Sequence, residues 1–250
     1  MLIGVVKPSH GILLDQHIEI AREMLLGGAD VAKDDENLLC GDPLNPIGER
    51  VGRTARMVLE AREFAGEPKL YVLNVQHELM IEQVIREVEK YQNHEPPLLG
   101  ILVSPLLGLP MLRMMRLQTP APMFVHSSGN ASLLRSQVRL SLTVYAKLLR
   151  MIGMDALVNA PPFSDKWGGS VNEAAQLLRG SSVGFAGLPR LFCCFGGGLG
   201  MTHVRDTLKA FPGADYGYLV GGAICAYEGG PRAGAAALLA QLRQESGLCG

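Results

Sequence analysis

Short apolar runs alternate with longer amphipathic stretches along the whole chain. Eight apolar runs predict buried strands: Leu2–Val6, Ala29–Ala32, Leu70–Val75, Leu99–Val103, Met123–Val125, Ala156–Val158, Leu191–Cys194 and Tyr216–Val220. Apolar residues recur at helical spacing in stretches between these runs: Leu14–Leu26, Val51–Phe64, Glu78–Tyr91 and Leu140–Ile152. Buried strands without alternating polar residues, each followed by a helix, are typical of a parallel sheet covered by helices.

Eight strand–helix units in 250 residues predict an α/β fold of the (β/α)8 type, the TIM barrel. The alternative is a doubly wound open sheet, which usually has fewer strands. The early GxGxxG motif of many such sheets is absent from this sequence. Because no linker or low-complexity segment interrupts the pattern, we expect residues 1–250 to form one barrel domain.

The composition limits the class of protein. Apolar residues make up 48% of the chain and charged residues 19%, and the formal net charge is −1. These values exclude an intrinsically disordered chain, which combines low hydrophobicity with high net charge. Balanced charge also argues against a broad basic face, so we expect no nucleic-acid partner.

Cysteine usage and the most apolar segment bear on location. No CxxC pair or zinc-type spacing occurs, so we expect free thiols in a reducing compartment. The five cysteines are Cys40, Cys193, Cys194, Cys225 and Cys249. The uncharged segment Pro96–Leu112 is broken by prolines, which predicts a buried strand and an apolar loop rather than a membrane span. Since the N-terminus has no signal-peptide pattern, we expect a cytoplasmic protein without a membrane partner.

The chemistry of such a barrel lies at the carboxyl ends of its strands, so the residues after each run are the candidates. Lys7 follows the first run, where a lysine can polarise a carbonyl, hold a phosphate or act as a base. His126 follows the fifth run and precedes Ser127 and Ser128. It could bind a phosphate or a substrate oxygen. The alternatives are a surface lysine and a structural histidine.

The sequence Lys33-Asp34-Asp35-Glu36 concentrates charge after the second run. Asp35 and Glu36 offer the oxygen ligands that Mg²⁺ prefers. Lys33 could ligate only as a carbamate, formed when its neutral amine takes up CO₂. Neighbouring carboxylates raise a lysine pKa and oppose that reaction, whereas a bound divalent metal would reverse the balance. A solvated loop or a helix N-terminus is the alternative.

Two glycine clusters, Gly196–Gly198 and Gly221–Gly222, follow the seventh and eighth runs. Barrels often bind phosphate with backbone N–H groups at these two positions, and glycine lets the backbone approach closely. Asn159 follows the sixth run and opens the loop Ala160–Gly169, which contains Lys166. That loop is either a lid that closes over a substrate or an ordinary surface loop.

The strand-end residues together resemble a known family. Lys7-Pro8, Lys33 to Glu36 and His126 resemble the barrel domain of the ribulose-bisphosphate carboxylase (RuBisCO) large chain and of the RuBisCO-like proteins. The separations of 26 residues from Lys7 to Lys33 and 93 from Lys33 to His126 agree with that family. Tyr71–Val75 resembles its third strand, and Gly221–Ala235 its last phosphate-binding strand end and the following helix.

The resemblance implies a role for each matching residue. Lys33 would be a carbamylated ligand of Mg²⁺, with Asp35 and Glu36 as the other two ligands. Lys7 would act near the reacting carbonyl, His126 would contact the substrate, and Lys166 would close over the site. Asn159, Gly197, Gly198, Gly221 and Gly222 would bind the substrate or its phosphate. The shared chemistry is enolisation, in which Mg²⁺ stabilises an enediolate.

Departures from the family change the implied activity. Ser9 stands where carboxylases carry a second lysine, Ser127 where they carry an arginine, and Asn159 where they carry a histidine. Phe195 lies near the position of a missing serine. These differences argue against carboxylation and favour a RuBisCO-like enolase or isomerase acting on a singly phosphorylated ketose. The alternatives are a decarboxylase of a phosphorylated β-keto sugar acid, and a ligand-binding barrel that needs a partner chain.

The resemblance also bears on assembly. The chain begins at the first barrel strand, so we expect the family's N-terminal α+β domain to be missing or supplied by a separate chain. The family implies a homodimer. Leu106–Leu112 and the Met111–Met115 cluster would form part of an interface or, as methionine-rich stretches often do, part of the core.

Overall fold

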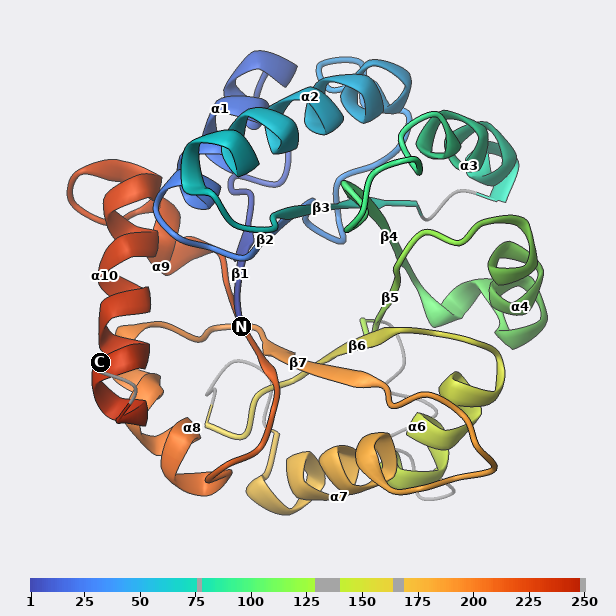
Figure 1. Cartoon of the computed structure of the whole chain (residues 1–250), viewed down its shortest axis with the longest axis vertical. Helices are drawn as coiled ribbons and strands as arrows, with labels where there is room; N and C mark the ends of the chain where they lie inside the picture. The colour runs from blue at the N-terminus through green and yellow to red at the C-terminus, as the bar shows by residue number, and fades with distance from the viewer. Residues whose placement is uncertain (76–77, 129–139, 164–168, 248–250) are drawn as a thin grey trace.

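The computed structural model of the chain describes residues 1–75, 78–128, 140–163 and 169–247. Eight parallel strands pair in chain order and close into a barrel, with helices around its outside (Figure 1). The strands are β1 Leu2–Val5, β2 Val31–Lys33, β3 Leu70–Asn74, β4 Leu99–Val103, β5 Met123–His126, β6 Ala156–Asn159, β7 Phe192–Gly196 and β8 Gly217–Val220. The predicted (β/α)8 fold is confirmed.

The helices follow the strands in the order expected of this fold. The α-helices are α1 Leu14–Leu26, α2 Ile47–Ala65, α3 Ile81–Glu89, α4 Leu109–Gln118, α6 Leu142–Met151, α7 Val171–Ser182, α8 Val204–Ala210, α9 Gly222–Cys225 and α10 Gly230–Ser246. Short 3-10 helices are η1 Glu78–Met80, η2 Pro105–Leu107 and η3 Met201–His203. Helix α10 packs against both α8 and α1, which closes the ring of helices.

Side chains alternate between two apolar layers. Ile3, Val31, Val72, Leu102 and Leu219 belong to a cluster inside the barrel. A larger cluster fills the space between the strands and the helices. Because successive strand residues point to opposite faces, every second side chain enters the barrel interior.

The second strand lies further along the chain than the sequence predicts. Its expected range was Ala29–Ala32, whereas β2 spans Val31–Lys33. The difference arises because residues 27–30 form the turn after α1, where Gly28 has a φ of 101° and Asp30 accepts a hydrogen bond from the Leu2 N–H. Val31 points into the barrel and Ala32 into the outer layer, so Lys33 points into the barrel as well.

The apolar segment Pro96–Leu112 holds a strand, as expected. The prediction of an apolar loop after that strand is wrong, because η2 and the start of α4 lie there. The Ser104 hydroxyl accepts a hydrogen bond from the Leu106 N–H and caps η2. Helix α4 then begins at Leu109, with a proline in its first turn where no N–H is needed. In the Met111–Met115 cluster, Leu112 and Met115 are buried whereas Met114 is 53% exposed, so the cluster belongs only partly to the core.

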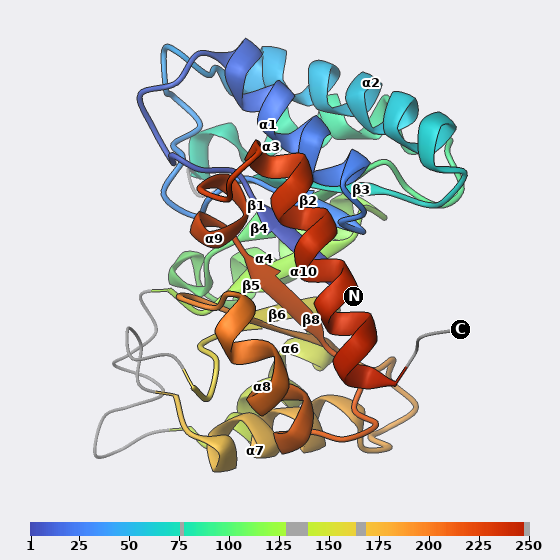
Figure 2. The ribbon, with the colours of Figure 1, turned by 90° about the vertical axis from the view of Figure 1, so that its left-hand side faces the viewer.

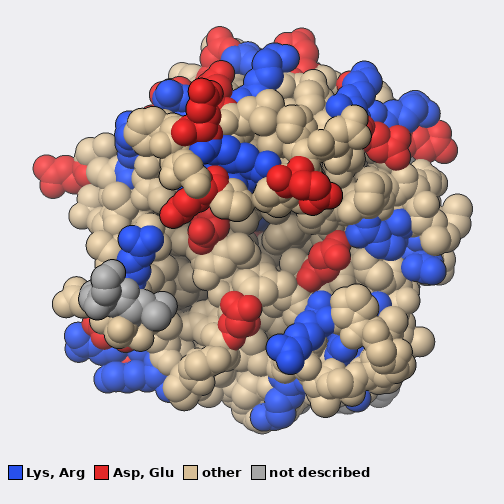
Figure 3. Space-filling view, viewed as in Figure 1, with Lys and Arg blue, Asp and Glu red and all other residues tan. Residues whose placement is uncertain are grey.

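Met1 and helix α9 mark the two ends of the barrel. Seen from the side, Met1 lies on the right and α9, which follows β8, lies on the left, at the carboxyl ends of the strands (Figure 2). On the face shown in Figure 3, basic and acidic side chains lie among one another around the rim, and neither sign forms a broad patch over the described residues. No helix in the described part of the chain is long and apolar enough to cross a membrane.

Candidate active site

A cavity of about 840 Å³ opens at the carboxyl ends of the strands. Its walls come from the residues that end or follow β1, β2, β5, β6, β7 and β8. Among the predicted site residues, those that line it are Lys7, Asp35, Glu36, His126, Asn159, Gly197, Gly198, Gly221 and Gly222. The structure therefore brings together residues from six strand ends, as the barrel fold predicts.

Lys33 differs from the other predicted residues because it does not line the cavity. Its side chain is fully buried, and its Nζ atom lies 3.6 Å from Glu36 Oε2. This amine makes no hydrogen bond to any described residue. Burial lowers the pKa of Lys33 by more than Glu36, Asp35 and Asp34 raise it. The balance is the opposite of the one weighed from the sequence, where only the carboxylates could be counted.

Asp35 is held at the edge of the cavity by two neighbours. Its Oδ2 pairs with Lys7 Nζ. Its Oδ1 accepts hydrogen bonds from the Asn37 N–H at 2.9 Å and from Asn37 Nδ2 at 2.7 Å. Burial raises the pKa of Asp35, but the bonds from Lys7 and Asn37 lower it by more. The pKa is therefore below its usual value, and the carboxylate is ionised at neutral pH.

His126, at the end of β5, faces Glu36 across the cavity floor, with Nε2 3.4 Å from Glu36 Oε2. Burial and the nearby Lys33 lower the pKa of His126 to about 4, so the ring is neutral at pH 7. The Ser128 N–H donates a 3.1 Å hydrogen bond to Nδ1. Because Nδ1 is therefore the acceptor, the neutral ring carries its proton on Nε2 and donates it toward Glu36 or a substrate oxygen.

Glycine backbone makes much of the cavity wall at the ends of β7 and β8. Gly197 and Gly198 follow β7 with φ values of 110° and 83°, which L side chains rarely adopt. A Cβ on Gly221 would lie 3.2 Å from Lys7 Cγ, so this glycine lets the two strand ends approach. The N–H groups of Gly222 and Ala223 open helix α9 and have no partner within it. This wall can offer backbone donors to an anion.

Aromatic packing supports the glycine wall from behind. Phe195 in β7 is fully buried in the outer layer. Its ring stacks on Phe211 at 5.7 Å and meets Tyr216 edge-on at 5.6 Å. Phe195 therefore points away from the cavity, and Gly196 occupies the last inward-facing position of the strand.

One predicted site residue cannot be placed, and several residues that line the cavity were not predicted from the sequence. Lys166, the proposed lid lysine, lies outside the described residues. Ser127, at the position of the family's arginine, lines the cavity with a buried hydroxyl that makes no hydrogen bond to a described residue. Asn37, Thr202 and His203 also line the cavity. Their one sequence signal was their position directly after a charged or glycine-rich strand end.

Comparison with known proteins places the chain. A family model described as "Ribulose bisphosphate carboxylase large chain, catalytic domain" matches residues 1–244. The ribulose bisphosphate carboxylase-like protein of Chlorobaculum tepidum is 28% identical over 242 residues, covering 94% of this chain and 53% of that protein. The ribulose bisphosphate carboxylase of Pyrococcus furiosus is 28% identical over 238 residues, covering 94% and 55%. The chain thus spans about half the length of the curated relatives it matches.

Solved structures share the fold. The octameric ribulose-1,5-bisphosphate carboxylase/oxygenase of Pyrococcus horikoshii superposes with a TM-score of 0.86 at 24% identity, over 98% of this chain and 57% of the other. A rubisco-like protein from Burkholderia fungorum gives a TM-score of 0.84 at 23% identity, over 99% and 60%.

Proposed function

The chain belongs to the ribulose bisphosphate carboxylase large chain catalytic domain family, and from this premise we propose that it is a RuBisCO-like, Mg²⁺-dependent enzyme. Its proposed reaction is the enolisation of a phosphorylated ketose through an enediolate, as in an enolase or isomerase, without fixation of CO₂. Its relatives include proteins described as carboxylases and proteins described as carboxylase-like, so family membership alone does not choose between these activities.

The observation that carries the proposal is the buried amine of Lys33. A lysine amine reacts with CO₂ only in its neutral form, and burial lowers the pKa of Lys33 toward that form. The absence of a hydrogen bond to a described residue leaves Nζ able to take the new group. A carbamate there would add an anionic oxygen donor beside Glu36, whose Oε2 is 3.6 Å away.

The donor set fits Mg²⁺ once Lys33 is carbamylated. In the described part of the chain, no three His, Cys, Asp or Glu side chains form a metal site by themselves. Asp35 and Glu36 supply two carboxylates, and the carbamate of Lys33 would supply the third donor, which gives the hard oxygen ligands that Mg²⁺ prefers. When bound, Mg²⁺ would supply positive charge beside the oxygens that become negative as a proton leaves the neighbouring carbon.

The chain's own residues would hold the substrate in the cavity. Lys7 Nζ would carry a proton near the carbonyl oxygen that is polarised. His126 would donate the hydrogen on Nε2 to a substrate oxygen, in the direction that its bond from Ser128 fixes. The backbone at Gly197, Gly198, Gly221 and Gly222 would bind the phosphate, with Asn159 beside it. Lys166 would close over the site.

The described cavity wall favours a substrate with one phosphate. Lys7 is the single Lys or Arg among the described residues that line it. Ser9 and Ser127 replace the cations that would hold a second phosphate and support carboxylation. A carboxylase that uses a bisphosphate would need more positive charge than the described residues of this wall offer.

The proposal is tested by Mg²⁺ calorimetry with and without bicarbonate on the wild type and Lys33→Ala. Lys69→Ala is the matched control, because Lys69 is also buried but precedes β3 at the other end of the barrel. We expect bicarbonate to tighten Mg²⁺ binding in the wild type and the control, and not in Lys33→Ala. Phosphorylated ketoses are then screened for exchange of the proton next to the carbonyl with deuterium.

Three results would contradict the proposal. A wild-type Mg²⁺ affinity that is the same with and without bicarbonate would contradict the carbamate at Lys33. CO₂ among the products would indicate a decarboxylase, and tight ligand binding without turnover would indicate a binding subunit. The expected homodimer stays a prediction, which analytical sedimentation would test. The Pyrococcus horikoshii structure is described as octameric.

A further inference from the structure

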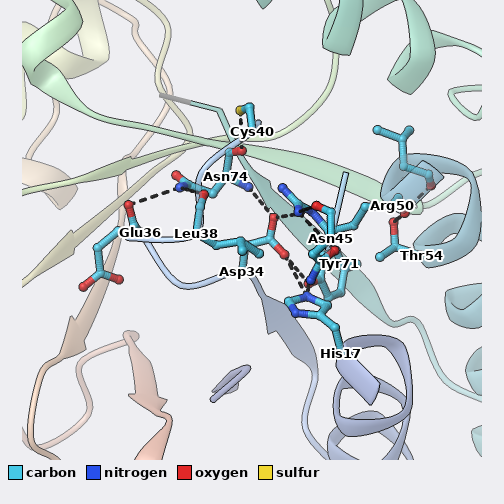
Figure 4. A network of polar contacts seen from close by, with 11 residues as sticks. His17, Asp34, Glu36, Leu38, Cys40, Asn45, Arg50, Thr54, Tyr71 and Asn74 are labelled. Carbon is cyan, nitrogen blue, oxygen red and sulfur yellow. Dashed lines mark hydrogen bonds and ion pairs between the residues drawn. The ribbon is translucent and has the colours of Figure 1, made fainter. Parts of the chain in front are cut away.

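The adjacent carboxylates Asp34 and Asp35 face opposite environments. Asp35 lines the cavity, whereas Asp34 is fully buried and does not reach it. Figure 4 shows the Asp34 carboxylate turned toward His17, Tyr71 and Arg50, while the Glu36 side chain points the other way. The mechanism proposed above does not use Asp34, so its burial needs a separate explanation.

Each oxygen of the Asp34 carboxylate has two partners. Oδ2 lies 3.1 Å from Arg50 Nε and accepts a 2.9 Å hydrogen bond from the Asn74 N–H. Oδ1 accepts a hydrogen bond from the Tyr71 hydroxyl and lies 3.1 Å from His17 Nε2. His17 Nε2 is also 2.6 Å from the Tyr71 hydroxyl, so the group closes on itself. A carboxylate this fully satisfied has one orientation open to it.

The partners tie the turn after β2 to three other elements. His17 comes from α1, Arg50 from α2, and Tyr71 and Asn74 from β3. Asn74 reaches further, since its Nδ2 donates to the Glu36 carbonyl oxygen at 3.1 Å and to the Leu38 carbonyl oxygen at 2.8 Å. The main chain is therefore held at both ends of the segment that carries Asp35 and Glu36.

Stability alone is a weak reason for such a group in a protein core. Replacing a buried ion pair by well-packed apolar residues is often neutral or stabilising, so an ion pair is not needed to fill this space. Directional bonds, however, fix the side chains beside them. Residues behind the ligands of a metal commonly do this, and their loss weakens metal binding by 10- to 100-fold.

We propose that His17, Asp34, Arg50, Tyr71 and Asn74 form a positioning brace, which holds the turn so that Lys33, Asp35 and Glu36 converge as ligands. This inference rests on the proposed function. The brace touches neither substrate nor metal. The brace holds the Asp34 side chain away from the barrel axis and binds the carbonyl oxygens of Glu36 and Leu38. The turn is then left with one arrangement, in which its other charged side chains meet at the cavity floor.

The test uses Tyr71→Phe and Asn74→Ala, each of which removes contacts of the brace without leaving Arg50 unpaired. Asp34→Asn is less useful, because it leaves the Arg50 cation buried without its counter-ion and risks unfolding. Tyr145→Phe is the matched control, since Tyr145 is a buried tyrosine on α6 outside the brace. Mn²⁺, which reports binding by electron paramagnetic resonance, serves as the probe metal, with bicarbonate present.

We expect Tyr71→Phe and Asn74→Ala to weaken Mn²⁺ binding by about 10-fold or more, and Tyr145→Phe to leave it unchanged. Carbon-13-labelled bicarbonate should give a weaker carbamate signal at Lys33 in the two brace variants. Thermal unfolding shows whether each variant is folded. Wild-type affinity in both brace variants would overturn the positioning role and leave the proposed function standing. A wild type that shows no bicarbonate-dependent Mn²⁺ binding would overturn both.

Discussion

The two sides of the cavity are supported by opposite kinds of packing. Behind the end of β2, the brace of five polar side chains fixes the turn through directional bonds. Behind the end of β7, the support is an aromatic cluster of Phe195, Phe211 and Tyr216. The first side presents charged side chains to the cavity, and the second presents glycine backbone.

The difference follows from what each side offers to a ligand. A site built from side chains needs their torsion angles fixed, and directional hydrogen bonds to the polar groups beside them contribute to this. A site built from backbone N–H groups needs only a strand end held in place, because the conformation of the glycines already aims the donors. Apolar packing is enough for that purpose, and it adds stability as well.

The largest expected effect is a loss of Mg²⁺ binding on the charged side without a loss of folding stability. Lys33→Met should weaken bicarbonate-dependent Mg²⁺ binding by about 1,000-fold, which is about 4 kcal/mol. Folding stability should stay within about 1 kcal/mol of the wild type or rise, because the variant removes a buried amine that makes no hydrogen bond to a described residue. Calorimetry and urea unfolding measure the two quantities. A large stability loss with retained Mg²⁺ binding would reverse the assignment of Lys33.

The second prediction is that the aromatic cluster behind the glycine side contributes to folding stability and not to Mg²⁺ binding. Phe195→Ala should lower the free energy of unfolding by about 3–5 kcal/mol, because it leaves a cavity at a fully buried site. Phe64→Ala is the control, since Phe64 is 65% exposed and its loss should cost about 1 kcal/mol or less. Under conditions where Phe195→Ala is folded, its Mg²⁺ affinity should match the wild type. A selective loss of Mg²⁺ binding would show that both supports serve the metal.

The third effect concerns backbone conformation at the glycine wall. Gly198→Ala places a side chain at a φ of 83° and should cost about 1–2 kcal/mol. Gly213→Ala meets comparable strain at a φ of 69°, in a turn away from the cavity. Inorganic phosphate, measured by calorimetry, should bind about 10-fold more weakly to the first variant alone, a change of about 1.4 kcal/mol. Equal phosphate affinity in both variants would exclude Gly198 from the anion site.

The smallest effect concerns Tyr216 in the aromatic cluster. Burial raises the pKa of Tyr216 to about 12, against about 10 in an unfolded chain. The folded state therefore keeps a proton that the unfolded state loses above pH 10, and stability falls as pH rises from about 10 to 12. Tyr216→Phe removes that slope and also a hydroxyl without a hydrogen bond to a described residue, which should add about 1 kcal/mol or less at pH 7. Urea unfolding at about pH 7 and about pH 10.5 compares the wild type with Tyr216→Phe. An equal fall in the free energy of unfolding between the two pH values in both proteins would contradict the raised pKa of Tyr216.

The fold could be predicted because the apolar runs and their helical connections are local features of the sequence. The meeting of Lys7, His126 and the glycine clusters then followed from the geometry of strand ends. The depth of Lys33 could not be predicted, since Lys33 is the last residue of β2, with its side chain inside the barrel, and not the first residue after the strand as the apolar run Ala29–Ala32 indicated. The brace was also missed, because His17 and Tyr71 are 54 positions apart and look like ordinary core residues in their own segments.

The ion pair between Lys7 and Asp35 would make metal uptake at the proposed site an exchange reaction. Asp35 already has a counter-ion from its own chain, so an incoming cation would displace the Lys7 amine rather than fill a vacant acidic site. Such an exchange would favour a divalent ion over Na⁺ or K⁺, which offer no more charge than the lysine they would replace. If Asp35 binds Mg²⁺ as proposed, the same exchange would free Lys7 Nζ to face the cavity, so that loading the site and freeing its lysine would be a single event.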